Sequence, residues 1–571
     1  MEPLYDRIDR CLVKSQFDGS DFLPQSSLDE LITPESIAGE LRSVGLDPTH
    51  SKFIFNVAKK VFTILVCIDM VAAIHGLLGE GFTDQHLPVD IDNQMGQGLV
   101  SCRSRKLFMS FAFIPWDRAR CRQFRNNQWL VQSPVFTMDF QEVDLDGRCP
   151  LPVIYFEKNV HRGHFSVVHK VKLHCSHQRI SNAPPVSITQ ALERSFRAKD
   201  IKVPGHEPYL ALKELTLNET EGYAELEMLQ TIRKCPTKHL IKAIAGFRRQ
   251  QGFYFLFRWA DGGNLREFWQ RENPEPLNAH LILWVLRQMH GLAGALTILH
   301  NFSPDKFGRH GDLKPENILL FKGADDYQVN SPGILQISDV GLAKFHAART
   351  NDRNVATDTT SGTQMYEPPE TEISPHLPRS RKYDIWSIGC IYLEFVIWIL
   401  RGFNELERFK NWRRNRFLLD ERFKFYTITA MQNEKATEAE IHPEIRSWVH
   451  ELYRDPRCRG NTALKDLLTL IDKKLLQIRI EDRINATELY QELSKIGKKI
   501  ESKSYLFNEA APPEGPLGPS SPSPLKEVVR NKYLVPPSPT SGQTLRPTTS
   551  GDNFSEFVRV SPPSPPNSDH E

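Results

Sequence analysis

The sequence predicts an α+β domain with two lobes, preceded by a mainly helical region and followed by a disordered tail. Short runs typical of strands dominate residues 150–260, and helical patterns dominate the residues that follow, up to 498. This order is expected when a β-rich lobe precedes a helical lobe. Beyond residue 498, prolines and serines replace the apolar residues that a folded core needs. We therefore divide the 571 residues into three parts, 1–149, 150–498 and 499–571.

The composition is that of an ordinary globular protein without a strong charge of either sign. Hydrophobic residues make up 40% of the chain, charged residues 25%, and the net charge is +2 at pH 7. This balance offers no electrostatic case for binding nucleic acid or an anionic membrane, and we expect neither as a partner. The basic run at residues 412–416 has no second basic patch, and we expect it in a loop on the lobe surface.

We expect no targeting or membrane-spanning segment. The N-terminal residues lack the basic and then apolar order of a signal peptide. Apolar stretches at 61–68 and 388–400 fall short of the roughly 20 residues that cross a bilayer, and we expect both in core helices. The nine cysteines are scattered without a CxxC pair, which is typical of reduced thiols in the cytoplasm or the nucleus.

The first 149 residues are predicted to form a folded accessory region, mainly helical. Apolar residues between 52 and 78 recur at helical spacing and predict one long packed helix. Aromatic residues are frequent between 95 and 150. Because no catalytic constellation is present in this region, we expect it to be an accessory region that docks a partner.

The two lobes are predicted from the period of their apolar residues. A helix is expected at 225–232, and a longer one at 283–299, where apolar residues follow at spacings of three and four. Strands are expected at residues 153–156, 167–173, 209–215 and 253–259.

The stretch HGDLKPEN at residues 310–317 carries the chemistry on which the functional prediction is based. It leads into an apolar run at 318–321 that predicts a buried strand. The Asp312 carboxylate can orient or deprotonate a hydroxyl, and the Asn317 amide oxygen can hold a divalent metal on bound phosphates. Lys314, between them, can meet the charge that builds on a phosphoryl group in transfer.

Further motifs occur before and after this stretch. Lys213 and Glu225 precede it, and Arg483 comes late in the chain; between them stand ISDVG at 337–341, GTQMYEPPE at 362–370 and DIWSIGC at 384–390. No single piece is decisive, but six pieces in this order and spacing rarely arise by chance. The set resembles the eukaryotic protein kinase domain over about residues 150–498. The resemblance implies a bilobal kinase fold, with ATP and Mg²⁺ as cofactors.

The resemblance also implies roles for individual residues. Asp312 is expected to accept or orient the substrate hydroxyl, and Lys213 to pair with the ATP phosphates while Glu225 holds it. Glu225 is preferred over its neighbour two residues on because Leu229 then lies one turn away on the same face. The remaining expected residues are Asp339 and Asn317 for Mg²⁺; Gly163, Val168, Ala211, Leu319, Phe257 and Ala260 for the nucleotide; and Glu370, Arg483 and Asp384 as structural braces.

The class of substrate follows from two positions. Lys314 after Asp-Leu, and Thr363 in Gly-Thr-x-x-Tyr, are similar to serine/threonine kinases rather than tyrosine kinases. We therefore expect protein substrates that offer serine or threonine. The context at 308–312 also resembles kinases of filamentous fungi with an N-terminal extension.

Three departures from the family pattern are present, and one of them, the sparse glycine loop, leaves a second hypothesis open. Of the three glycines usual in the phosphate-covering loop, only Gly163 is present, and Val340 replaces the phenylalanine of Asp-Phe-Gly. Gly311 replaces the arginine before Asp312, so activation by a loop phosphate pairing with that arginine is not expected. The alternative is a pseudokinase scaffold that binds protein partners. We favour the active enzyme because every charged group that the chemistry needs is present.

Overall fold

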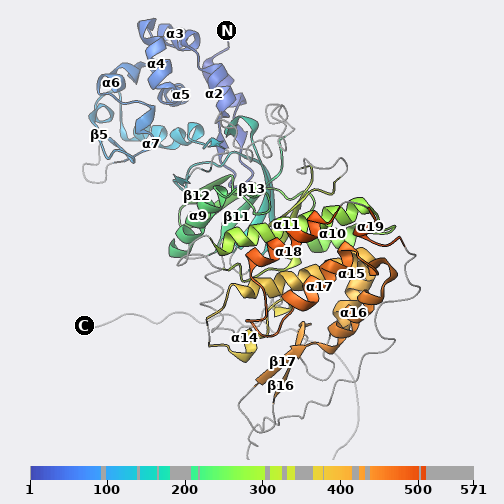
Figure 1. Ribbon diagram of the computed structural model, residues 1–571. Coiled ribbons are helices and arrows are strands. Elements are labelled where there is room, and N and C mark those ends of the chain that lie inside the picture. The colour runs from blue at the N-terminus through green and yellow to red at the C-terminus, as the bar shows by residue number, and fades with distance from the viewer. Residues whose placement is uncertain are drawn as a thin grey trace, which may run out of the picture. The chain divides into compact units, whose positions relative to one another are not determined.

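The computed structural model describes residues 2–509 apart from 92–97, 138–139, 141, 164–165, 180–206, 217–218, 302–308, 324–330, 341–363, 377, 414–422, 431–436 and 501–502. Within these residues the chain forms a mainly helical accessory region, a β-rich lobe and a helical lobe, in that order (Figure 1). The predicted two-lobed α+β fold is therefore confirmed. The disorder expected of the tail concerns mostly residues 510–571, which lie outside the described residues.

The accessory region consists of short helices and strands around its own apolar core. Phe62, Ile74 and Phe82 are fully buried in this core. The elements are α1 (Leu4–Arg10), β1 (Val13–Lys14), β2 (Asp21–Phe22), α2 (Gln25–Leu31), α3 (Pro34–Ser43), α4 (Ser51–Val57), α5 (Lys59–Cys67), α6 (Ile74–Gly79), β3 (Val89–Ile91), β4 (Leu99–Ser101), β5 (Leu107–Phe108), α7 (Arg118–Asn127), β6 (Phe136–Thr137) and β7 (Glu142–Leu145).

The single long helix predicted over residues 52–78 is wrong, because this stretch forms the three helices α4, α5 and α6. Ala58, between α4 and α5, has a non-helical φ of −140°. The Asp84 carboxylate accepts hydrogen bonds from the N–H groups of Lys60 and Val61 at 3.0 and 2.9 Å, and so caps the start of α5 from a distant part of the chain. The helical spacing continues across the break because both helices face the same core.

The β-rich lobe is built on a six-stranded sheet with the strand order β7-β12-β13-β11-β9-β8. Its strands pair antiparallel, except that β7 of the accessory region joins β12 in parallel. The four predicted strands and the predicted helix are present as β8, β9, β11, β13 and α9. The bounds are β8 (Val153–Arg162), β9 (Ser166–Leu173), β10 (Gln178–Arg179), β11 (Leu210–Leu215), α9 (Glu219–Arg233), β12 (Ala245–Arg249) and β13 (Gly252–Arg258).

Both faces of this sheet are buried, as the alternation along β13 makes clear. Phe253, Phe255 and Phe257 point to one face and belong to the core that includes α9 and the helical lobe. Tyr254 and Leu256 point to the other face, into a core completed by residues from the end of the accessory region. Successive side chains of a strand lie on opposite faces, so the accessory region covers the face turned away from α9.

The helical lobe is organised around α15, in which residues 383–400 are all buried. The core helix expected at 388–400 is thus confirmed; α11 and α15 are apolar enough to span a bilayer, but both are largely buried inside the protein. The elements are α10 (Leu265–Arg271), α11 (Ala279–His300), β14 (Ile318–Phe321), β15 (Ile334–Ile337), α14 (Glu370–Ile373), α15 (Lys382–Trp412), β16 (Tyr426–Ala430), β17 (Thr437–Ile441), α16 (Pro443–Arg454), α17 (Ala463–Leu470), α18 (Ala486–Lys498) and α19 (Lys503–Leu506).

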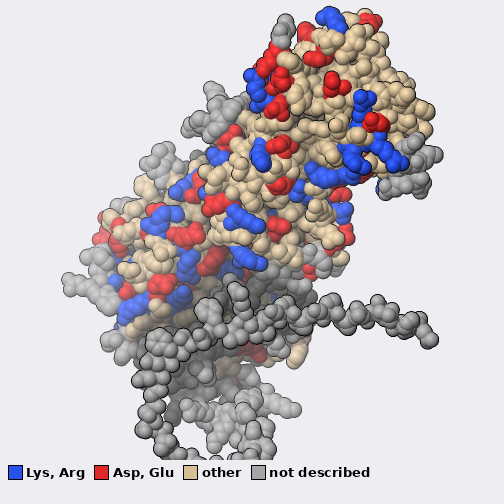
Figure 2. Space-filling model, turned by 180° about the vertical axis from the view of Figure 1, so that it is seen from behind, with Lys and Arg blue, Asp and Glu red and all other residues tan. Residues whose placement is uncertain are grey.

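The first residues of the predicted tail differ from the expectation, because they pack on the helical lobe. Tyr505, Leu506 and Phe507 are between 4% and 6% exposed and belong to its core. These three side chains supply apolar area that the Pro/Ser-rich residues after them lack. On the face drawn in Figure 2, acidic and basic side chains are interspersed over most of the described surface, in keeping with the small net charge.

Candidate active site

Three charged side chains from distant parts of the chain meet between β11, α9 and the end of β15. The Lys213 Nζ atom lies 3.2 Å from Glu225 Oε1 and 2.9 Å from Asp339 Oδ1. Lys213 is 5% exposed and Glu225 is 1% exposed. Burial by itself would lower the pKa of Lys213, but the two carboxylates outweigh it, and the pKa is raised above its usual value. The ammonium is therefore a fixed positive charge.

Asp339 is held in a backbone conformation that few non-glycine residues adopt. Its φ is 55°, in the left-handed region. The preceding residue, Ser338, donates its N–H to the Asn317 carbonyl at 2.9 Å and accepts from His310 Nε2 at 2.7 Å. Burial would raise the pKa of the Asp339 carboxyl, but Lys213 reverses the effect and the pKa lies below its ordinary value. Asp339 thus carries its negative charge beside Lys213.

Asp312, Lys314 and Asn317 are in direct contact within the loop that precedes β14. The Lys314 Nζ atom lies 2.9 Å from Asp312 Oδ2. The Asn317 side-chain nitrogen donates to the Asp312 carbonyl at 2.8 Å and to its Oδ2 atom at 3.1 Å. Because the nitrogen of Asn317 is used in this way, its Oδ1 oxygen faces away from Asp312 as an acceptor. The loop therefore presents one carboxylate and one amide oxygen in a fixed relation.

The Asp384 carboxylate holds the backbone of this loop in place, as expected. Its Oδ2 atom accepts from the N–H of His310 at 2.6 Å, and its Oδ1 atom accepts from the N–H of Gly311 at 2.8 Å. His300 donates to it as well, at 2.8 Å. Burial raises the pKa of the Asp384 carboxyl, but the hydrogen bond from His300 and nearby groups lower it below its usual value. Gly311 has a φ of 81°, which glycine adopts without strain.

Three of the predicted nucleotide-binding residues, Val168, Ala211 and Phe257, share the face of the sheet that carries Lys213. Val168 of β9 pairs with Lys213, and Ala211, two residues before it on β11, pairs with Phe257 of β13. Cross-strand partners and residues two apart point to the same side. Leu319 of β14 is brought toward the connector after β13, because the next residue donates to the Gly263 carbonyl at 2.8 Å.

The contacts of the remaining predicted residues, Ala260 and Gly163, place them less closely relative to Lys213. Ala260 lies in the connector and packs against the same core as Leu319. Gly163 lies between β8 and β9, where its N–H donates to the Ser166 carbonyl at 2.9 Å. Thr363, on which part of the substrate prediction depends, lies outside the described residues.

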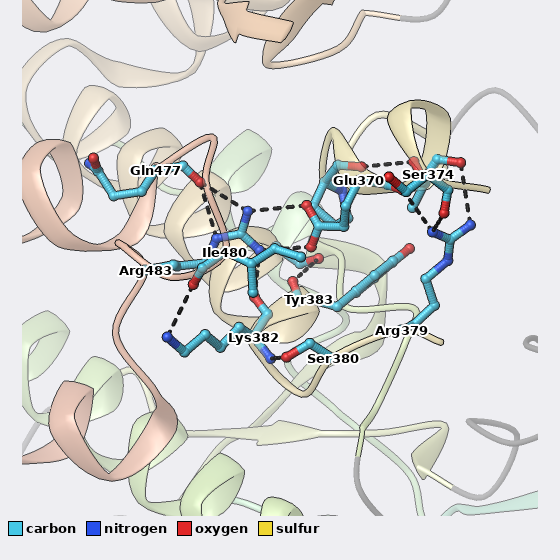
Figure 3. A network of polar contacts seen from close by, with 12 residues as sticks. Glu370, Ser374, Arg379, Ser380, Lys382, Tyr383, Gln477, Ile480 and Arg483 are labelled. Carbon is cyan, nitrogen blue, oxygen red and sulfur yellow. Dashed lines mark hydrogen bonds and ion pairs between the residues drawn. The ribbon is translucent and has the colours of Figure 1, made fainter. Parts of the chain in front are cut away.

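Glu370 and Arg483 form the buried pair that was expected, and Figure 3 shows its surroundings. Arg483 Nη1 lies 2.9 Å from Glu370 Oε1, and the guanidinium also donates to the carbonyls of Lys382 and Gln477. Arg483 is completely buried and lies over the Trp386 ring at 5.2 Å. The pair joins the first residue of α14 to the segment that precedes α18, which is a structural role.

Sequence reasoning missed a buried polar network behind the site. Arg413, expected with its basic neighbours in a surface loop, is only 1% exposed and lies 3.2 Å from Glu394 of α15. Glu394 also accepts from the Tyr366 hydroxyl at 2.7 Å, and Arg266 lies 2.6 Å from the same hydroxyl. Nothing in the run of residues 412–416 distinguishes one arginine from the next, so no local signal could have found it.

This fold and site define a two-lobed domain with a buried Lys–Glu–Asp cluster at the junction. The family model that describes the protein kinase domain matches residues 205–493, about half of the chain. The chain belongs to the protein kinase family.

Curated proteins similar to this chain include three kinases. Serine/threonine-protein kinase tousled-like 1 of Caenorhabditis elegans is 31% identical over 192 residues, which cover 31% of this chain and 19% of that protein. Serine/threonine-protein kinase 33 of Bos taurus is 30% identical over 29% of this chain and 31% of its own length. Serine/threonine-protein kinase Nek5 of Mus musculus is 25% identical over 35% of this chain and 28% of its own length. The chain thus spans a third or less of these relatives.

Proposed function

We propose that this protein is a serine/threonine kinase that transfers the γ-phosphate of ATP to hydroxyl groups of protein substrates. The observation that carries the proposal is the hydrogen bond between Ser338 and Asn317, at 2.9 Å, which sets Asp339 and the loop of Asp312 side by side. Lys213 lies within 2.9 Å of Asp339. The names of the relatives support the same class of reaction.

The residues present fit a Mg²⁺ ion held together with phosphates. Mg²⁺ is usually bound by one or two protein oxygens while phosphates and water complete its shell. Asp339 offers a carboxylate that is 41% exposed, and Asn317 offers the Oδ1 oxygen that Asp312 does not use. Within the described residues no group of three or more His, Cys, Asp or Glu side chains could hold a metal by itself, in keeping with a site completed by the nucleotide.

In this proposal ATP supplies the phosphoryl group, and Mg²⁺ neutralises part of its charge. The Lys213 ammonium has three N–H donors, of which two are directed at Glu225 and Asp339. The third donor binds the phosphates. Asp312 orients the substrate hydroxyl and accepts its proton, and it is held in place by Lys314 and Asn317. Lys314 also places a positive charge where negative charge develops.

A phosphate-transfer assay on a generic basic protein, with Mg²⁺ and ATP, tests the proposal. We expect transfer to serine or threonine by the wild type, and a loss of at least 100-fold in Asp312→Asn. Asp482→Asn is the matched control, because Asp482 has a side chain 60% exposed and lies 3.9 Å from Arg479. It is expected to keep the wild-type rate.

Thermal unfolding with and without Mg²⁺ and ATP separates the enzyme from the scaffold. Nucleotide at 100 times its Kd should stabilise the wild type and Asp312→Asn alike, by about 2.7 kcal/mol. Equal transfer by wild type and Asp312→Asn would refute the assigned role of Asp312. Wild type without any transfer would instead support the pseudokinase scaffold, with or without nucleotide binding.

A further inference from the structure

Phe140 of the accessory region has a backbone conformation unusual for an aromatic residue. Its φ is 54°, in the left-handed region, which bulky side chains rarely adopt. Its N–H donates to the Ile244 carbonyl at 3.1 Å, directly before β12. Such a conformation persists only where other contacts offset its cost. The contacts of the Phe140 ring must therefore stabilise it.

The tip of the Phe140 ring lies over Gly246 of β12, next to Leu226 in the middle of α9. A Cβ atom at Gly246 would lie 3.0 Å from Phe140 Cζ and 2.8 Å from Leu226 Cδ1. Both side chains thus fill the space that a larger residue at this position would need, and only glycine permits the approach. Leu226 follows Glu225 in the sequence and is 6% exposed. Phe140 consequently packs beside the helix turn that carries the partner of Lys213.

Two polar contacts tie the same part of the accessory region to the two ends of α9. Near the C-terminal end, the Gln230 side chain donates to Glu142 of β7 at 3.5 Å. At the N-terminal end, Arg248 of β12 joins Asp144 of β7, at 3.3 Å, to Glu219, at 2.6 Å. Phe140, β7 and its strand partner β12 therefore contact the helix at both ends and in its middle.

The position of α9 matters because it carries a buried charge. Glu225 and Lys213 are both nearly inaccessible, and their side chains meet at 3.2 Å. If α9 moved away from β11, Glu225 would lose its partner while still shielded from water, which is strongly unfavourable. The contacts that α9 makes with Phe140, β7 and β12 therefore decide how firmly the ion pair is held.

We propose that Phe140 and β7 are positioning elements that hold α9 where Glu225 pairs with Lys213. The region before the kinase domain then supports the nucleotide site of its own chain. For its effect on phosphate transfer this inference rests on the proposed function, whereas its effect on α9 does not depend on that function.

Hydrogen exchange of the full chain, followed by mass spectrometry, tests the position of α9 independently of activity. In Phe140→Ala we expect at least tenfold faster exchange over residues 219–233 and no change over β14 and β15. Phe17→Ala is the matched control, because this accessory-region ring packs on Phe156 and Tyr254 at the opposite face of the same sheet. It should leave the exchange of α9 unchanged. The same acceleration in both variants, or none in Phe140→Ala, overturns the inference.

Kinetics give the second readout. Phe140→Ala should raise the KM for ATP and lower kcat, together at least tenfold, with the KM for the protein substrate unchanged. Phe140→Leu keeps an apolar contact and should lose only two- to threefold; it also serves if Phe140→Ala does not fold. Gly246→Ala adds a methyl group in the same place and should resemble Phe140→Ala, although it removes nothing.

The two experiments distinguish a failure of the proposed function from a failure of the positioning role of Phe140. If the wild type transfers no phosphate but Phe140→Ala loosens α9, the proposed function fails and the positioning role stands. If the wild type transfers phosphate while Phe140→Ala keeps both its rate and the exchange of α9, the positioning role fails and the proposed function stands.

Discussion

Replacement of Arg413 by methionine is expected to destabilise the helical lobe strongly. The guanidinium is completely buried between two rings, with its centre 4.4 Å from the Phe409 centroid and 3.9 Å from the Phe425 centroid. It lies 3.2 Å from the carboxylate of Glu394, which is likewise inaccessible to solvent. Methionine fills part of the space between the rings but carries no charge. The variant therefore isolates the electrostatic part of the contact.

The expected loss of stability depends on the hydrogen-bond donors that remain around Glu394 after Arg413 is replaced. After the loss of Arg413, the Tyr366 hydroxyl at 2.7 Å and Arg266 at 3.5 Å remain as its donors. Removal of one member of a buried pair costs about 3–5 kcal/mol, and each cation–π contact contributes about 0.5–2 kcal/mol. Because the two remaining donors still serve the carboxylate and methionine retains some packing, we expect a loss of about 3–4 kcal/mol in the free energy of unfolding.

Urea unfolding of the full chain, followed by tryptophan fluorescence, measures this loss. Arg454→Met is the control, since Arg454 has a side chain 65% exposed and pairs with Glu451 one turn away; it should change stability by less than about 0.5 kcal/mol. Adding Glu394→Gln to Arg413→Met removes the carboxylate charge that Arg413 no longer balances and should recover about 2 kcal/mol. A loss below about 1 kcal/mol, or a double variant no more stable than the single one, would refute the reasoning.

Two further predictions concern pH and backbone conformation. Burial lowers the pKa of His442 from 6.5 to about 4, so the contribution of the neutral histidine to stability is present above pH 6.5 and is lost as the pH falls toward 4. Over that window the free energy of unfolding of the wild type should fall by about 3 kcal/mol more than that of His442→Asn, which keeps the acceptor for the Glu444 N–H. Urea unfolding at each pH measures this difference. Gly311→Ala should lower stability by about 1–2 kcal/mol because of its positive φ, whereas Gly497→Ala, in a helix with open space around it, should not destabilise; thermal unfolding compares the two, and equal effects would contradict the role of the turn.

Local patterns in the sequence were sufficient to predict the two lobes and the charged residues that lie between them. Asp312, Lys314 and Asn317 lie within six residues, and their contacts are made inside one loop. Lys213 stands in a strand whose alternation is visible in the sequence, and Asp339 comes two residues after the end of another strand, Ile334–Ile337. Functional groups of this kind are recognisable because their neighbours along the chain set their surroundings.

The sequence by itself thus determined the two lobes, their main strands and helices, and the loop that holds Asp312, Lys314 and Asn317 together. Only the tertiary structure decided where residues 52–78 break, which arginine of 412–416 is buried, and that Phe140 reaches helix α9. Each of these depends on a partner far away in the chain: the carboxylate of Asp84, that of Glu394, and the space left open by Gly246. A periodic pattern records which face of an element is apolar, but it does not record what that face meets.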